Sequence, residues 1–365
     1  MKTCLRDAAV AVAAVSAAVA LAACGDADGG SGGGADGLKI GLLLPSSQTS
    51  RYEEWDRPLI ERRIKELCGA CTVLYANAQL DVDRQLQQMN SVISRGADVL
   101  ILDPVNATSL RSLVNMADQA GVPVVAYDRL AEGRISGYVS FDNEQVGRLQ
   151  GQDLLKAMGK KADGGQIVML NGAPTDPNAA DFKRGALSVL KGKVKIGKSY
   201  DAPGWRPAEA HRSMSDAIAA LGADNIDGVY AAGDNLATGA ISALKAAKIK
   251  PLPPVTGQNA DLAAVQRIVV GDQYMSVYKP FRPETDAAAA MAVALGRGEE
   301  GMLADIATTT VGNDTTKDVP AVLLTPISLT VDNIEETVVK DGLYTIDQIC
   351  TPEFRSACDR AGLTG

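Results

Sequence analysis

Short apolar runs alternate with longer amphipathic stretches along most of this chain, beginning at Lys39. Several runs are continuously hydrophobic, which is typical of parallel strands buried on both faces. The segments between them, such as residues 82–95 and 207–221, carry apolar residues at helical spacing and predict amphipathic helices. The runs are IGLLLP (40–45), TVLYANA (72–78), DVLILDP (98–104), VPVVAYD (122–128), YVSFD (138–142), QIVMLNG (166–172), KVKIGKSY (193–200), GVYAAGD (228–234), PPVTGQ (253–258) and YMSVYKP (274–280).

This alternation predicts an α/β fold with parallel sheets that carry helices on both faces, in two doubly wound domains. The chain has 365 residues, which is enough for two such domains. Ligands of such sheets bind beyond the carboxyl ends of the strands. Polar residues at those ends together predict a polar cleft, although any single one could instead cap a helix. They are Asp128, Asp142, Asn171, Asp234 and Gln258.

The first residues carry an export signal. Lys2 and Arg6 precede an Ala/Val-rich stretch, residues 8–20, that is too short for a permanent membrane span. It ends in Leu-Ala-Ala-Cys at Cys24, which resembles the lipobox of bacterial lipoproteins. The resemblance implies cleavage before Cys24 and attachment of lipid to that cysteine. An ordinary secretory peptide with a coincidental cysteine is the alternative.

A Gly/Ser/Asp-rich segment follows the anchor cysteine and cannot bury a core, so it predicts a flexible tether. We therefore expect a signal peptide over 1–23 and a lipidated tether over 24–37. This order places the folded part outside the membrane.

Four cysteines remain after export, an even number in an oxidising compartment. We favour pairing of near neighbours, Cys68 with Cys71 and Cys350 with Cys358, although four cysteines allow three connectivities. Redox chemistry at Cys68-Gly-Ala-Cys71 would need the pair at the start of a helix, where the helix dipole lowers a thiol pKa. Here the pair follows a predicted helical run, residues 51–67.

Composition narrows the class of ligand. The formal net charge is −8 and no block of Lys and Arg occurs, so nucleic acid is not expected as a partner. His211 is the only histidine, no G-x-S-x-G motif occurs, and clustered Cys and His ligands for zinc are missing. The segment from Gly185 to Lys193 fails the spacing of a phosphate-binding loop. We expect no catalytic residue, no metal and no cofactor.

The polar residues suit a sugar, whose hydroxyls donate and accept hydrogen bonds and whose C–H face is apolar. Such a ligand needs carboxylates, amides, fixed cations and an aromatic plate. The candidates are Asp128 and Arg129 side by side, Asn143, Asn178 and Asn259, the cations Arg51 and Lys279, and Trp205 for stacking. Asp128-Arg129 could instead be a structural ion pair, Trp205 could cover a loop, Lys279 could be solvated, and Asp234 could cap a helix.

Six separated motifs resemble the D-xylose-binding members of the ribose/galactose-type periplasmic binding protein family, in the same order and spacing. The resemblance runs from about Lys39 to Tyr344. The motifs are AYDR (126–129), FDN (141–143), GAP (172–174) with Asn178, GW (204–205), GQNADL (257–262) and VYKP (277–280), and DVPAVLLTPI (318–327) resembles the C-terminal crossover of that family.

The resemblance implies sugar contacts from Arg51, Asp128, Arg129, Asn178 and Lys279, with Trp205 stacking on the ring. Tyr52 stands where the family has Trp, and Asn143 is assigned by analogy with the wider family. Asp234 can touch sugar while it caps a helix. Asn259 replaces an Asp of the xylose binders, and Gly233 replaces an Asn. These two departures concern which sugar binds more than the class of ligand.

The resemblance implies a type I periplasmic binding fold with two lobes joined by three crossings, near Asp142, Gln258 and Val319. The N-terminal lobe would comprise 38–142 plus 259–318, and the C-terminal lobe 143–258 plus 319–365. The protein would be a monomer that binds a monosaccharide, D-xylose first, by hinge closure. It would then deliver the sugar to the membrane subunits of an ABC permease.

Three rival functions stay open. A sugar receptor that engages a membrane kinase or chemoreceptor would have the same fold. A secreted glycosidase could use Asp128 and Asp234, but Arg129 and Lys279 would keep both carboxylates ionised, whereas one must be a protonated acid. A lactose-repressor-type regulator would need a DNA-binding helix pair where residues 1–37 hold a signal and tether.

Overall fold

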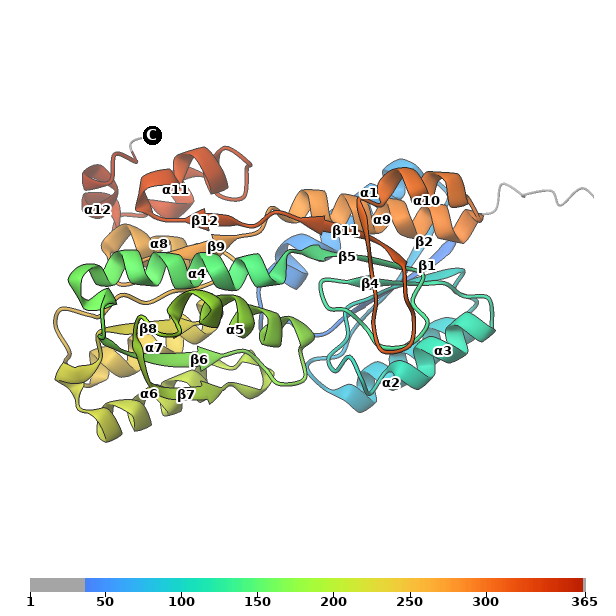
Figure 1. The fold of residues 1–365 in the computed structure, drawn as a ribbon. Helices are drawn as coiled ribbons and strands as arrows, with labels where there is room; N and C mark the ends of the chain where they lie inside the picture. Colours follow the sequence, from blue (N-terminus) through green and yellow to red (C-terminus); the bar gives the residue numbers. More distant parts are fainter. Residues whose placement is uncertain (1–36, 364–365) are drawn as a thin grey trace, which may run out of the picture. The chain divides into compact units, whose positions relative to one another are not determined.

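A computed structural model of the protein describes residues 37–363, and Figure 1 shows its fold. The expected signal peptide, the anchor Cys24 and nearly all of the tether lie outside the described residues. The described chain forms two α/β lobes, each with a parallel sheet and helices on both faces. This confirms the predicted fold class, because the buried apolar runs become strands and the amphipathic stretches between them become helices.

The first lobe is built on a seven-stranded sheet in the order β10-β11-β5-β4-β3-β1-β2, in which only β10 is antiparallel to its neighbour. Its strands are β1 (Lys39–Leu44), β2 (Thr72–Asn77), β3 (Val99–Leu102), β4 (Val124–Tyr127), β5 (Gly137–Phe141), β10 (Thr309–Val311) and β11 (Val319–Leu324). Its helices are α1 (Arg57–Leu67), α2 (Val82–Ser94), α3 (Arg111–Gln119), α9 (Phe281–Arg297) and α10 (Glu300–Ile306).

Successive residues of β1 face opposite layers of this lobe. Leu42 and Leu44 pack against α1 and α9, whereas Leu43 packs against α2 and α3. Figure 1 shows these two helix pairs on opposite faces of the sheet. A strand that is buried on both faces has no polar alternation. This explains why β1 reads as a continuous apolar run.

The second lobe contains the parallel sheet β7-β6-β8 and the antiparallel pair β12-β9. Its strands are β6 (Gln166–Asn171), β7 (Lys195–Asp201), β8 (Gly228–Ala231), β9 (Ser276–Tyr278) and β12 (Ile327–Leu329). Val255, in the predicted run at 253–258, makes a single bridge to Val229 of β8. The helices are α4 (Asn143–Met158), α5 (Pro177–Leu190), α6 (Pro207–Leu221), α7 (Asp234–Ala246), α8 (Leu262–Val270), α11 (Ile346–Ile349) and α12 (Arg355–Arg360).

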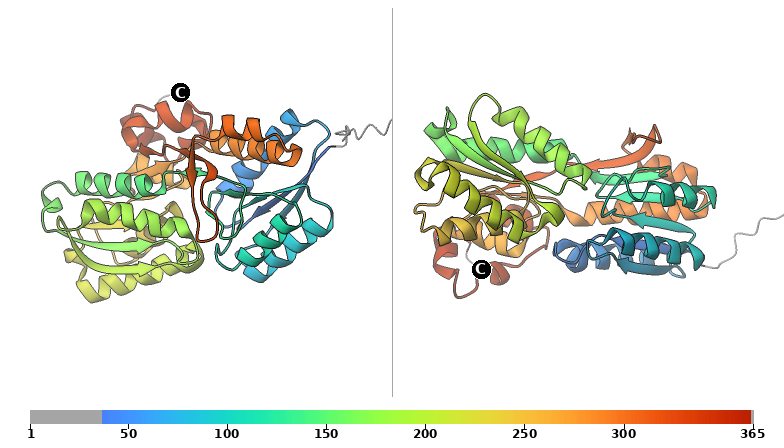
Figure 2. Two further views of the ribbon diagram at one scale, coloured as in Figure 1. Left: turned by 45° about the vertical axis from the view of Figure 1, so that its right-hand side comes forward. Right: turned by 90° about the horizontal axis from the view of Figure 1, so that it is seen from below.

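Short helical turns join these elements. They are the π-helical turns η1 (Tyr52–Asp56) and η6 (Glu335–Val339) and the 3₁₀ turns η2 (Gly159–Ala162), η3 (Pro203–Trp205), η4 (Ala223–Asn225) and η5 (Val331–Asn333). Helices α11 and α12 pack on α8, and both views of Figure 2 place this red C-terminal segment on the second lobe. No helix among residues 37–363 is long and apolar enough to cross a membrane.

The chain passes between the lobes after β5, after β9 and after β11. The first passage lies at Asp142, between β5 and α4. The second lies at Lys279–Pro280 instead of Gln258, because β9 and the residues before it pack in the second lobe. The third lies between β11 and β12 instead of at Val319, because β11 extends the first sheet beside β5.

The predicted lobe boundaries are therefore wrong in two places. Residues 259–279 belong to the second lobe, where Met275 and Val277 join its core. Residues 319–324 belong to the first lobe. Apolar runs identify strands, but they do not say which of two sheets a strand joins.

Two disulfides link the cysteine pairs that the sequence favours. Cys68 and Cys71, with Cα atoms 5.3 Å apart, follow α1 and are buried in the first lobe. Cys350 and Cys358, with Cα atoms 5.9 Å apart, link the end of α11 to α12. Neither pair stands at the start of a long helix, where a reactive thiol is usually placed.

Candidate functional site

A small polar cavity lies where the carboxyl ends of strands from both lobes meet. The first lobe contributes the start of η1 with the loop before it and the residues after β4. The second lobe contributes residues that follow β6, β7, β8 and β9. The lining residues are Thr49, Arg51, Tyr52, Asp128, Arg129, Asp176, Asn178, Phe182, Trp205, Asn235, Gln258, Asn259 and Lys279. We call this the polar cavity. Its place agrees with the rule that open α/β sheets bind ligands beyond their strand ends.

Asp128 is the centre of this cavity. Its backbone has a left-handed φ of 57°, and its carbonyl accepts hydrogen bonds from Ser140 Oγ at 2.7 Å, Tyr138 Oη at 3.1 Å and Asn178 Nδ2 at 3.0 Å. Asn178 belongs to the second lobe, so this last bond joins the lobes directly. The main chain at Asp128 is therefore fixed from both sides, and the carboxylate is aimed rather than free.

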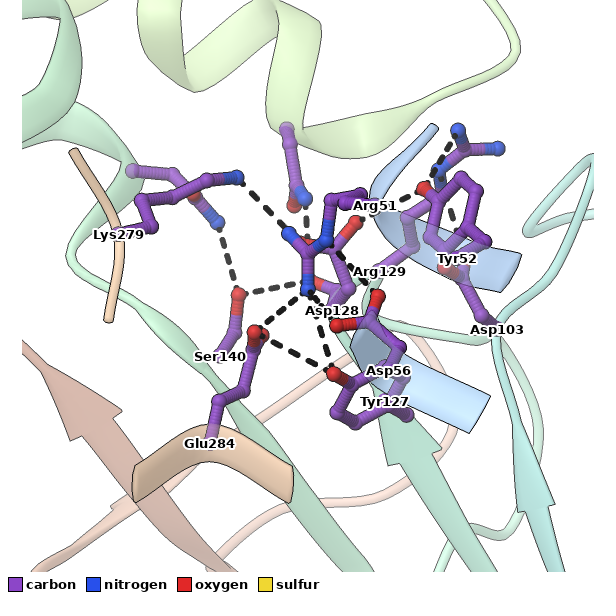
Figure 3. A network of polar contacts seen from close by, with 12 residues as sticks. Arg51, Tyr52, Asp56, Asp103, Tyr127, Asp128, Arg129, Ser140, Lys279 and Glu284 are labelled. Carbon is purple, nitrogen blue, oxygen red and sulfur yellow. Dashed lines mark hydrogen bonds and ion pairs between the residues drawn. The ribbon is translucent and has the colours of Figure 1, made fainter. Parts of the chain in front are cut away.

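Two cations, Arg51 and Lys279, lie beside the Asp128 carboxylate, as Figure 3 shows. Oδ1 lies 3.3 Å from Arg51 Nη1 and 3.7 Å from Lys279 Nζ, and Oδ2 accepts from Tyr52 Oη at 3.3 Å. Burial alone would raise the pKa of this group, but Lys279, Arg51 and Arg129 lower the pKa to about 2. Asp128 is therefore an ionised acceptor at neutral pH. Burial lowers the pKa of Lys279.

Arg51 is almost wholly enclosed, with 2% of its surface exposed. Its Nε and Nη2 bind Asp56 at 2.8 and 3.2 Å, and Nη2 also binds Glu284 at 2.6 Å (Figure 3). The ring of Phe281 lies under the guanidinium, with its centroid 4.8 Å away. Only Nη1 therefore points to Asp128 and the cavity. Asp56 and Glu284, which sequence reasoning missed, hold this cation in place.

Glu284 sits in the first turns of α9 with no exposed surface. Burial, followed by the neighbouring carboxylates Asp128 and Asp56, raises the pKa of Glu284 to about 8 against the opposing effect of Arg51. The site thus contains a carboxyl group that gains or loses a proton near neutral pH. Among residues 37–363, Arg51 is the one cation that pairs with it directly.

Arg129 joins the two lobes. Its Nε lies 2.9 Å from Asp176 Oδ2 of the second lobe and 3.4 Å from Asp103 Oδ1 of the first, and Nη1 donates to the carbonyl of Pro104. Burial raises the pKa values of Asp176 and Asp103, and Arg129 opposes this. Asp128 and Arg129 each pair with other residues. The structure therefore does not show the ion pair between these two neighbours that the sequence allowed.

Trp205 is held in a fixed position beside the cavity. Its Nε1 donates to Asp176 Oδ2 at 3.0 Å, and its ring meets Phe182 edge to face at 6.2 Å. Gly172 leaves room for the ring, because a Cβ there would lie 2.2 Å from its outer edge. The ring belongs to the core of the second lobe and also lines the cavity. It can therefore stack on a ligand at little entropic cost.

Two predicted residues do not line the polar cavity. The carboxylate of Asp234 accepts from Ser276 Oγ, Gln273 Nε2 and the backbone N–H of Asp261 at 2.8 to 3.0 Å, and burial raises its pKa. Asp234 therefore ties the first residue of α7 to residues 261–276, and it does not cap the helix, as the sequence allowed, because α7 has no side-chain cap. Asn143 donates to Ser140 Oγ at 3.2 Å, and Ser140 Oγ donates to the carbonyl of Asp128. Asn143 therefore contacts Asp128 only through Ser140.

Of the five polar strand ends, Asp128 and Gln258 line the cavity. Asp142 caps α4, and Asn171 donates to Asp201 and Ser199. The fifth residue, Asp234, lies outside the cavity lining and bonds to residues 261, 273 and 276. Asp176 was missed because it caps α5 through the N–H of Asn178, a pattern that predicts only a helix start. Asn235 was also missed, although it follows the predicted strand end directly.

The chemistry of the cavity is that of polyol recognition. Fixed donors, one ionised acceptor, amide groups and an indole face meet in a space enclosed by both lobes. No group of His, Cys, Asp and Glu in residues 37–363 has the arrangement of a metal site. Asn259 has a left-handed φ of 99°, and its Oδ1 is buried with no partner in the part of the chain that the structure describes.

Comparisons with known proteins agree with this geometry. Residues 40–300 match the model of the periplasmic binding protein domain family. The chain is 38% identical to the D-xylose-binding periplasmic protein of Escherichia coli strain K12, over 85% of this chain and 92% of that protein. It is 30% identical to the multiple sugar-binding periplasmic receptor ChvE of Rhizobium radiobacter, over 86% and 93%.

A solved structure also has a similar fold. An ABC transporter solute binding protein from Clostridium phytofermentans with bound β-D-glucose superposes with a TM-score of 0.78. The two sequences are 29% identical, and the match covers 85% of this chain and 99% of that one.

Proposed function

Because the chain belongs to the periplasmic binding protein domain family, we propose that it is the extracytoplasmic substrate-binding subunit of an ABC sugar importer. It binds one monosaccharide, with D-xylose first, between its two lobes. The observation that carries this proposal is the polar cavity, where Asp128, Arg129, Asn178 and Lys279 converge beside Trp205. The relatives named above are sugar-binding proteins rather than enzymes, in agreement with the sequence prediction.

A neutral sugar fits the electrostatics of the cavity better than an ionic ligand. The cations Arg51, Arg129 and Lys279 are each already matched by at least one carboxylate. A charged ligand would therefore bring into the cavity a buried charge that has no counter-charge of its own, which is costly. Hydroxyl groups can bind between an acceptor and a donor without disturbing the balance.

Closure of the lobes follows from the bonds that already cross between them. Asn178 binds the carbonyl of Asp128, and Arg129 pairs with Asp176. A sugar held by the same residues adds hydrogen bonds that only the closed arrangement can make. The differential contacts shift the population toward that arrangement, as hinge closure requires.

D-Xylose is favoured by the similarity to D-xylose-binding proteins, at 38% and 37% identity. Two positions in the site are relevant to this choice. Asn259 lines the cavity where the xylose binders have Asp, and a Cβ at Gly233 would lie 3.5 Å from the Trp205 ring. An amide at 259 accepts hydroxyl hydrogens less strongly than a carboxylate and can also donate.

Export and anchoring complete the proposal. Cleavage before Cys24 and lipidation would hold the protein at the outer face of the membrane, and residues 25–37 would let it reach the permease as a monomer. The lipobox-like residues before Cys24 support this. Tethering raises the effective concentration of the protein near its permease.

The test is calorimetric titration of the mature chain with xylose, ribose, arabinose, glucose, galactose and inositol. We expect xylose to bind most tightly, and Trp205→Ala to weaken binding strongly. Absence of binding by every sugar at millimolar concentration would refute a monosaccharide site. Tight binding that Trp205→Ala and Asp128→Ala leave unchanged would refute the site assignment instead.

A further inference from the structure

A second cavity lies on the other side of the crossing that follows β9. It has a volume of about 340 Å³, which is within the usual range for small-molecule sites of about 300 to 1,000 Å³. Its lining residues are Trp55, Leu59, Tyr278, Pro280, Phe281, Arg282, Pro283, Asp341, Gly342 and Leu343. We call it the rear cavity. The polar cavity is much smaller, with a volume of about 30 Å³.

One short segment forms the wall between the two cavities. Successive side chains along an extended chain point to opposite sides. Lys279 lines the polar cavity, whereas its neighbours Tyr278 and Pro280 line the rear cavity. The ring of Phe281 continues this wall, since it lines the rear cavity and also carries the Arg51 guanidinium at 4.8 Å.

The walls of the rear cavity come from both lobes. Trp55 and Leu59 lie on η1 and α1 of the first lobe, as the start of α9 does, and they pack with residues of the second lobe in one apolar cluster. Residues 341–343 follow β12 and belong to the second lobe, where Asp341 accepts a hydrogen bond from Tyr278 Oη at 3.0 Å. Because the segment at 279–280 is a crossing, a rotation about it that widens the polar cavity brings the walls of the rear cavity together.

The lining indicates the chemical class of ligand. Aromatic rings, prolines and leucines form most of the wall, and its two charged residues, Arg282 and Asp341, are exposed to solvent. The Trp55 Nε1–H is buried and has no hydrogen-bond partner among residues 37–363. A hydroxyl group that reached it through a small shift of the ring would recover that desolvation cost.

We propose that the rear cavity is a second ligand site for a small, uncharged ring compound with a hydroxyl group, and that its occupation strengthens sugar binding. A molecule in this space opposes the narrowing that accompanies opening, so it favours the closed form that holds sugar. Coupling of this kind is reciprocal, so sugar strengthens binding of the second ligand by the same factor. The coupling rests on the proposed sugar function, but occupation of the rear cavity does not.

The experiment uses phenol and cyclohexanol as probes on the mature chain. Binding is first followed by NMR without sugar, and sugar affinity is then measured by calorimetry with and without each probe. We expect the probe to raise sugar affinity about fivefold or more, the lower end of typical allosteric coupling. We expect the probe to have no effect on sugar affinity in Leu59→Trp, because the new side chain fills the cavity. We expect the full effect in Met302→Trp, an exposed control on α10.

Leu59 is buried, so Arg282→Trp at the exposed rim is a second blocking variant that does not disturb the core. Failure of both probes to bind the wild type at millimolar concentration would overturn the rear-cavity site. Probe binding that leaves sugar affinity unchanged or lowers it would overturn the coupling. Equal probe binding in both blocking variants would overturn the location. Probe binding without binding of any sugar would support the second site while the proposed sugar function fails.

Discussion

At the scale of single residues, the site depends on one ionised acceptor and one confined cation. Asp128 and Arg51 are both buried, and each makes more contacts with other protein residues than it can make with a ligand. This preorganisation means that a ligand pays little for ordering the side chains. Substitutions here should therefore change affinity more than their number of ligand contacts suggests.

Asp128→Asn keeps the shape of the side chain but removes its charge. We expect sugar affinity to fall by about ten- to hundredfold, because a hydrogen bond to a charged group contributes about 1.5 to 3 kcal/mol. Arg51 and Lys279 would also lose a counter-charge. Calorimetry with xylose measures the change. Asp142→Asn is the control, because Asn also caps helices and Asp142 lies outside the cavity lining; an equal loss there would argue against a specific role of Asp128.

Glu284 should make folding stability depend on pH. Burial raises its pKa to about 8 in the folded protein, whereas the unfolded chain has the ordinary value near 4.3. The protonated form is thus favoured by folding, and stability is fully present at low pH and falls as pH rises toward 8. Its charged neighbours in the fold are Arg51, Asp56, Asp128 and Lys279, and Tyr127 donates to it.

The test is the melting temperature of wild type and Glu284→Gln between pH 5 and pH 9. We expect the variant, which stays neutral, to show a shallower decline over this range. Asp261, whose pKa is raised to about 7, contributes a similar slope in both proteins and therefore cancels in the comparison. Parallel curves for the two proteins would contradict the assignment to Glu284.

At the scale of elements, the loops after the strands determine how the aromatic plate is placed. Trp205 depends on the loop after β6, where Gly172 leaves space for the indole ring. Gly172→Ala places a Cβ into that ring, and overpacking of this kind usually costs about 1 to 3 kcal/mol. We expect weaker sugar binding and a changed tryptophan emission spectrum.

A matched control for this change is Gly69→Ala, because a Cβ at Gly69 meets no atom within 4 Å. That variant should bind sugar as the wild type does. If Gly172→Ala also retained wild-type affinity, Trp205 would not be a stacking residue.

The sequence predicts elements better than it predicts their partners. Buried strands such as β1 and β3 are evident because both faces are apolar, and the strand ends correctly indicate Asp128. Glu284 could not be found in this way, because it meets Arg51 only through packing of α9 against the start of α1. Nothing in a single sequence links residues so far apart. The same limitation applies to β11, which pairs with β5 across nearly two hundred residues.

At the scale of the whole molecule, an apolar cluster joins the two lobes on the side of the rear cavity. Beside the polar cavity, they are joined by polar contacts that a ligand can supplement. The ion pair of Arg129 with Asp176 is one of them. Asp176→Asn retains the helix cap and an acceptor for Trp205 but removes the charge. We expect the sugar-free protein to open more often and sugar affinity to decrease.

Small-angle scattering of the sugar-free and sugar-bound forms measures this change. The variant should have a larger radius of gyration than the wild type without sugar, and the same radius with saturating sugar. Asp201→Asn, on the same lobe but outside the polar cavity, serves as the control. Equal radii in the absence of sugar would show that this ion pair does not hold the lobes together.

The place of β11 in the first sheet has a consequence for how the chain is made. This strand lies between β5 and β10, yet it is built from residues 319–324, near the end of the sequence. Nascent chains emerge from the ribosome from the N-terminus onward. The first lobe therefore cannot complete its sheet until residues 319–324 have been synthesised, long after β5. A chain that crosses the membrane before folding gains from this delay, because its leading lobe stays incomplete, and so can be threaded, until this late strand has been made.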